Sequence, residues 1–119
     1  MSYDPENIFA KILRGEIPCI KIYEDDHALA FNDINPQAPI HVLVIPKGPY
    51  VSMDDFTEMA SNDQVAGFFK AVGNTARQLG LSLPGYRILV NIGDNGMQEV
   101  PHLHVHIMGG KKMGQMVVT

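Results

Sequence analysis

The chain has 119 residues, of which 45% are hydrophobic and 18% charged. This length and balance predict one globular domain with a buried core and exclude intrinsic disorder. The net charge of −4, with no basic run longer than Lys111-Lys112, gives no general reason to bind nucleic acid, so an anionic ligand would have to be held by local hydrogen-bond donors.

Cysteine content and apolar run lengths indicate an intracellular protein without a membrane partner. The single cysteine, Cys19, cannot form an internal disulfide and is expected to be a small buried side chain. No apolar run approaches the roughly 18 residues of a membrane-spanning helix, and MSYDPENIFAK lacks the pattern of a signal peptide. We therefore expect a cytoplasmic location.

The first half of the chain predicts a helix followed by three strands. The helix lies within DPENIFAKILRGEIP, with Asp4 as its capping residue. Two strands follow at CIKIYED and ALAFND. After a proline-rich connection, the β-branched run IHVLVIP predicts a strand that is buried on both faces.

The second half predicts a short helix at MDDFTEM, a long helix over residues 63–79, and strands at YRILVNI and HLHVHIM. Gly67 and Gly73 each cost the long helix about 1 kcal/mol relative to alanine, which suggests that something packs closely there, a partner chain being one candidate. The order of elements favours an α+β fold with an antiparallel sheet.

Three of the five histidines occupy every second position of HLHVHIM, at residues 102, 104 and 106. On a strand they would share one face over about 13 Å, while the apolar residues between them face the core. A neutral imidazole is a competent nucleophile when its second nitrogen is held protonated. His104, flanked on both sides, is the natural nucleophile, and His41 begins a strand that could pair beside this one.

Two other interpretations of the histidine row remain open. Two histidines at alternate positions of a strand can share a zinc ion, although three spread over about 13 Å do not readily converge on one tetrahedral ion. The rings could also be buried structural groups with satisfied hydrogen bonds. The fifth histidine, His27, has no comparable neighbours and is expected to be solvated.

The motif HLHVHIM resembles that of the histidine-triad (HIT) family of nucleotide hydrolases and transferases. The segments IFAKILRGEIP, AFNDINPQAPIHVLVIPK and NIGDNGMQEVPHLHVHIMGG resemble the branch that hydrolyses purine nucleoside phosphoramidates. The resemblance covers about residues 6–114. It implies one HIT domain over 1–119, with a five-stranded antiparallel sheet, two main helices and a ten-stranded sheet across a homodimer.

The resemblance also implies roles for individual residues. His104 would attack the α-phosphorus, His106 would donate to a phosphate oxygen, and the main-chain carbonyl of His102 would keep the second nitrogen of His104 protonated. His41 would help to place a proton, and the acceptor-only carboxylate of Asp33 would bind both ribose hydroxyls. The base would be enclosed by Ile8, Phe9, Phe31, Ile34 and Leu43, each also a plausible core residue, and the phosphate and leaving group would be faced by Asn91, Met97, Gln98 and Glu99.

The chain departs from the animal members of the family at the leaving-group end of the site. Glu99 stands where many animal members carry a serine, whereas bacterial members resemble this chain at that position. Pro101 replaces the aromatic residue that is common before the first histidine. The C-terminal KKMGQMVVT has no tryptophan. Leaving-group preference is therefore the part of the function that the resemblance determines least.

The function expected from these features is hydrolysis of AMP or GMP phosphoramidates by a homodimer, without a metal or other cofactor, through a nucleotidyl-histidine. One alternative is a dinucleoside polyphosphate hydrolase of the same family. The other is a non-catalytic, regulatory nucleotide-binding protein. The expected partner is a purine nucleotide, not nucleic acid or a membrane.

Overall fold

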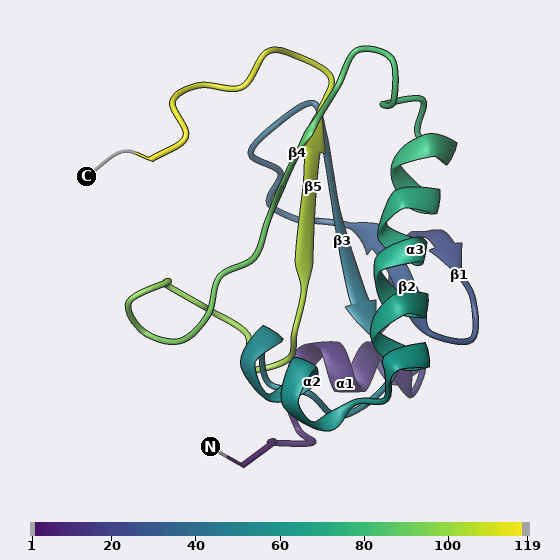
Figure 1. The fold of residues 1–119 in the computed structure, drawn as a ribbon, viewed down its shortest axis with the longest axis vertical. Helices are drawn as coiled ribbons and strands as arrows, with labels where there is room; N and C mark the ends of the chain where they lie inside the picture. The colour runs from purple at the N-terminus through teal and green to yellow at the C-terminus, as the bar shows by residue number, and fades with distance from the viewer. Residues whose placement is uncertain (1, 118–119) are drawn as a thin grey trace.

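A computed structural model describes residues 2–117, and its five strands form one antiparallel sheet in the order β1-β2-β3-β5-β4 (Figure 1). The expected α+β fold is confirmed. The elements in chain order are α1 (Ile8–Leu13), β1 (Lys21–Glu24), β2 (Ala28–Asn32), β3 (Ile40–Pro46), α2 (Met53–Met59), α3 (Asn62–Gln78), β4 (Arg87–Leu89) and β5 (Val105–Gly109). Among the described residues, no helix has the length and hydropathy needed to cross a membrane.

The first helix begins later than its sequence suggests. Asn7, not Asp4, is the N-cap, and its side chain accepts a hydrogen bond from the Ala10 amide at 2.9 Å. Asp4 instead shapes the turn before the helix, where its carboxylate accepts from the Glu6 amide at 2.9 Å. Both residue types cap helices well, so the choice between them depended on where the preceding turn ends.

Helix α3 covers one face of the sheet, and its two glycines meet residues of the same chain. A Cβ on Gly67 would lie 2.3 Å from the His27 ring, so the glycine makes room for that ring. A Cβ on Gly73 would lie 3.3 Å from the Arg77 guanidinium. At both glycines the close neighbour therefore belongs to the same chain, not to the partner chain that was one candidate. His27, expected to be solvated, is half-buried.

The sheet has a buried cluster on each face, formed by alternate residues of the same strands. In β3, Val42 and Val44 join the cluster beneath α3, whereas Leu43 and Ile45 join Phe9 of α1 on the opposite face. All four β3 side chains are at most 5% exposed, which confirms the prediction of a strand buried on both faces.

The last two strands are shorter than predicted. Residues 90–104 leave the sheet because their backbone groups find partners elsewhere: the Leu103 amide donates to the Tyr50 carbonyl at 2.9 Å, and the His102 amide to the Val100 carbonyl at 2.9 Å. His102 and His104 thus precede β5, and only His106 lies within it. The alternation nevertheless holds, because Leu103, Val105 and Ile107 all belong to the cluster beneath α3.

Candidate active site

Two adjoining pockets open on the face of the sheet opposite α3. The apolar pocket has a volume of about 650 Å³ and the polar pocket about 370 Å³, which is the size range of small-molecule sites. They meet at five shared residues: Asp33, Asn35, Glu99, His104 and His106. The junction therefore combines two carboxylates with two of the histidines from the motif.

The backbone fixes the tautomer of His104. Its Nδ1 lies 2.8 Å from the main-chain carbonyl oxygen of His102. A carbonyl only accepts hydrogen bonds, so Nδ1 carries the proton and Nε2 has a free lone pair. Burial lowers the pKa of His104, and this outweighs the opposing effects of that carbonyl and of the Asp33 and Glu99 charges. The ring is consequently neutral near pH 7 and presents a bare nitrogen to both pockets.

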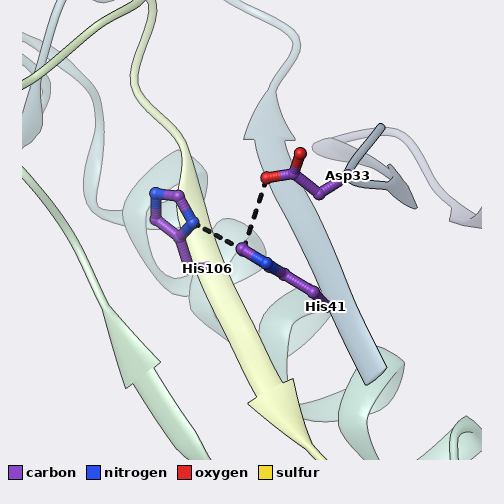
Figure 2. Close-up of side chains that lie close together, drawn as sticks. All are labelled: Asp33, His41 and His106. Carbon is purple, nitrogen blue, oxygen red and sulfur yellow. Dashed lines mark hydrogen bonds and ion pairs between the residues drawn. The ribbon is translucent and has the colours of Figure 1, made fainter. Parts of the chain in front are cut away.

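His106 has the opposite tautomer, and a chain of two hydrogen bonds determines it. The Gln37 amide donates to His41 Nδ1 at 2.9 Å, which leaves the His41 proton on Nε2. That nitrogen lies 2.9 Å from His106 Nδ1 and 3.4 Å from Asp33 Oδ2, as Figure 2 shows. His106 Nδ1 therefore accepts a hydrogen bond, and the His106 proton is on Nε2.

The Nε2 atom of His106 is buried and has no hydrogen-bond partner among the described residues. Burial, with the neighbouring His104 and His41 rings, lowers the pKa of His106 to about 4. A neutral ring with an unsatisfied N–H is costly to bury without a partner. The ring lines both pockets, so this unsatisfied N–H lies where the two pockets meet.

His102 is a structural group. Its ring is fully buried, its Nε2 donates to the Pro46 carbonyl at 3.0 Å, and its Nδ1 accepts from the Tyr3 hydroxyl at 2.6 Å. Burial lowers the pKa of His102 to about 4. Both of its nitrogens are satisfied and the ring lines neither pocket, whereas its carbonyl contacts His104.

Apolar residues that are exposed to solvent surround the apolar pocket. Ile34 is 95% exposed and Ile8 42%, although both line the cavity. Phe9 lies edge-on to the His104 ring, with 5.0 Å between the ring centroids. Exposed aliphatic side chains around a concave surface are typical of a site that binds a flat apolar ligand.

The polar pocket also contains a possible metal-binding group. Asp33, His41 and His106 each offer one ligand atom, and these atoms lie within 4.8 Å of one another. Two nitrogen ligands of a tetrahedral zinc ion lie about 3.3–3.4 Å apart, whereas the His41 and His106 nitrogens are 2.9 Å apart. A shared proton fits this spacing as it stands, and a zinc ion would require the two rings to separate.

The structure brings most of the candidate residues together, with one exception. The five apolar candidates line the apolar pocket, and Asn91, Met97 and Glu99 line the polar one. Gln98, expected to face the phosphate, lines neither. Its amide instead accepts from the Gly93 amide at 3.0 Å and donates to the Val51 carbonyl at 2.6 Å, which secures the preceding turn.

Several pocket residues were not identified from the sequence. Asn35 and Gln37 lie in the proline-rich connection after β2, where polar residues are ordinarily read as a solvated loop. Cys19, expected to be a buried core residue, is half-exposed and lines the apolar pocket, where burial raises the pKa of its thiol. Tyr3 lines neither pocket but bonds to the His102 ring, and the sequence near it gives no signal of this because its partner lies 99 residues away.

Comparisons with known proteins match most of the chain in sequence and in fold. The HIT domain family model matches residues 14–113. An uncharacterized 13.2 kDa HIT-like protein of Azospirillum brasilense is 60% identical over 116 residues, covering 98% of this chain and 95% of that protein. The purine nucleoside phosphoramidase of Escherichia coli is 41% identical over 113 residues, covering 94% and 93%. The solved structure of a histidine triad protein from Clostridium difficile has a TM-score of 0.83 at 46% identity, covering 92% and 95%.

Proposed function

This chain belongs to the HIT domain family, and on that premise we propose that it hydrolyses purine nucleoside 5′-phosphoramidates to a nucleotide and a free amine. The observation that carries the proposal is the opposite protonation of two neighbouring imidazoles. His104 offers a bare nitrogen and His106 an N–H donor at the junction of the two pockets. The identity to E. coli purine nucleoside phosphoramidase supports the same substrate class.

In the first step, His104 Nε2 attacks the α-phosphorus and forms a nitrogen–phosphorus bond as the bond to the amine breaks. The departing nitrogen takes the bonding electron pair and a proton from water. The N–H of His106 donates to a phosphate oxygen, and the His102 carbonyl stabilises the charge that develops on His104. In the second step, water attacks the same phosphorus, which releases the nucleotide and restores the free imidazole.

In this proposal, the purine binds in the apolar pocket and the phosphate binds in the polar pocket. The purine enters the apolar pocket, where Ile8, Phe9, Phe31, Ile34 and Leu43 contact its faces. Asp33 binds the ribose: its Oδ1 already accepts from the Asn35 amide at 2.8 Å, and its remaining lone pairs are available to the two hydroxyls. Asn91 lines the polar pocket beside the phosphate.

The charge of the pockets argues against the dinucleoside polyphosphate alternative. Among residues 2–117, neither pocket is lined by a lysine or an arginine, and both are lined by Asp33 and Glu99. A chain of phosphates would place several negative charges there without a counter-charge. A phosphoramidate has one negative charge and an amine that can be cationic.

A substrate panel tests the proposal. Adenosine 5′-phosphoramidate and diadenosine polyphosphates are compared by kcat/KM, each with and without exhaustive chelation. We expect faster hydrolysis of the phosphoramidate, unchanged by the chelator. Loss of all activity on chelation, restored by stoichiometric zinc, would revive the metal interpretation, and absence of turnover with tight AMP binding would favour the regulatory alternative.

The wider setting of this activity is also a proposal. We expect residues 1–119 to act as one domain, although positions 1, 118 and 119 lie outside the described residues. A homodimer with a continuous ten-stranded sheet would join two edge strands, and at β4 Ile88 is 47% exposed. Light scattering should then give a dimer that Ile88→Glu weakens. A cytoplasmic location remains an expectation.

A further inference from the structure

Resting on the proposed function, we infer that Met97 and Glu99 form a subsite for the leaving group that selects amines with a second, positive charge on an apolar stem. The two residues alternate along the segment between β4 and β5, and both line the polar pocket beside His104. His104 is 6% exposed, and among residues 2–117 only its Nδ1 has a hydrogen-bond partner. Its free nitrogen therefore faces the space that these two side chains border.

Met97 supplies the apolar part of the subsite. It has a φ of 59°, which makes it the one non-glycine residue with a positive φ among the described residues. That conformation is strained for a residue with a side chain and persists only when the surroundings impose it. Here Gln98 imposes it through its bonds to Gly93 and Val51. The result is a flexible thioether side chain, 77% exposed, held over a polar cavity.

Glu99 supplies the charge. It lines both pockets, and its carboxylate makes no ion pair with any lysine or arginine of residues 2–117. Asp33 adds a second carboxylate to the same lining; its Oδ1 accepts from the Asn35 amide, and its Oδ2 lies 3.4 Å from His41 Nε2. A cation on the leaving group would give Glu99 a counter-charge that the described residues do not supply, whereas an anionic leaving group would be repelled.

The two contributions act on different parts of one leaving group. The P–N bond must lie next to His104, so the amine occupies the part of the polar pocket that Met97 and Glu99 border. An alkyl stem covers the thioether, and a terminal ammonium pairs with the carboxylate. Because Glu99 is exposed, water screens this pair and its contribution to selectivity is modest.

Three adenosine 5′-phosphoramidates of similar length test the inference, with 1,5-diaminopentane, hexylamine or 6-aminohexanoate as the leaving amine. For the native protein, we expect kcat/KM to be about fivefold higher for the cationic than for the neutral compound, and about fivefold lower again for the anionic one, the range of exposed charge interactions. Glu99→Gln should bring the three values together, and Glu99→Lys should reverse their order, whatever the absolute rates.

Two further variants separate the subsite from general effects. Glu58→Gln removes the same charge from an exposed position of α2 and should leave the ratios unchanged. Met97→Gly suits the positive φ and should reduce the advantage of a pentyl over a methyl stem about twofold to threefold.

The outcomes distinguish this inference from the proposed function. Equal rates for all three compounds, unchanged in Glu99→Gln, would overturn the subsite and leave the phosphoramidate hydrolase intact. Failure to cleave any of the three would overturn both.

Discussion

Helix α3, which covers one face of the sheet, has 17 residues, whereas α1 on the opposite face has six. Beneath α3 the sheet residues are sealed: Val42, Val44, Val105 and Ile107 have no exposed surface. On the α1 face the cover is incomplete, and both pockets open there. The same strands thus provide a dry core on one side and a site on the other, because the length of the covering helix decides how much of each face remains accessible.

The largest effect should come from the nucleophile on the open face. His104→Ala is expected to lower turnover by on the order of 10⁴-fold or more while leaving nucleotide binding and the fold largely intact. Rapid quenching of the native enzyme should trap an acid-labile, base-stable nucleotidyl adduct, which His104→Ala should lose and His102→Ala should retain. Near-native turnover by His104→Ala would refute the assignment.

A core substitution on the face beneath α3 should lower stability and leave turnover nearly unchanged. Phe68 of α3 is fully buried against Phe56 at a ring distance of 5.4 Å. Phe68→Ala should lower the free energy of unfolding by about 3–5 kcal/mol, with kcat per folded molecule little changed. Urea unfolding and active-site titration measure the two quantities. A variant that stayed stable but lost kcat would show that the two faces are not separable in this way.

Substitution of Asp33, on the open face, should weaken binding of the ribose and leave the contacts of the base unchanged. Loss of its charged acceptor should weaken ribonucleotide binding by about 1.5–3 kcal/mol for each hydrogen bond removed. Asp33→Ala should scarcely change the affinity for 2′,3′-dideoxy analogues, which lack the hydroxyls. Titration calorimetry with both ligands makes the comparison, and equal losses would exclude the ribose role.

Stability should depend on pH through the histidines of the open face. The pKa values of His102 and His106 are about 4, against an ordinary 6.5. Between these values the unfolded chain binds more protons, so the free energy of unfolding should fall as pH falls from 6.5 to 4, and the full contribution should be present above 6.5. Each ring adds up to about 1.4 kcal/mol per pH unit, His106 less because it borders an open pocket.

Urea unfolding from pH 7 to 4 measures this slope, and His102→Gln should reduce it whatever the absolute stability of the variant. A profile that stayed flat in the native protein would mean that the rings are not held neutral by burial.

The smallest effects concern the two glycines of α3. Gly67→Ala places a Cβ against the His27 ring, and the resulting overpacking should outweigh the helix gain and destabilise by about 1 kcal/mol. Gly73→Ala meets only the end of the Arg77 side chain, which can move, so it should stabilise by up to about 1 kcal/mol. Opposite signs in thermal unfolding support the intramolecular packing, and equal gains would contradict it.

Local patterns in the sequence were sufficient for much of the fold. The spans of β3 and α2 match IHVLVIP and MDDFTEM, because a continuous β-branched run and the capping box of Ser52 with Asp55 are determined by adjacent residues. The tautomer of His104 is also determined by a nearby residue, because its partner carbonyl is two residues away. The spacing of the histidines also predicts that the apolar residues between them face the core, because side chains alternate in extended backbone.

Contacts between distant residues decided the rest. His106 is a donor because His41, 65 residues away, points a protonated nitrogen at it, and His41 does so because the Gln37 amide occupies its other nitrogen. His102 is structural because Tyr3 and Pro46 satisfy both of its nitrogens. The sequence alone determined that three imidazoles would lie in a row. Only the tertiary structure assigned the protons of His102 and His106, because the tautomer of a neutral imidazole depends on the atoms that face its two nitrogens, and for these two rings those atoms come from distant residues.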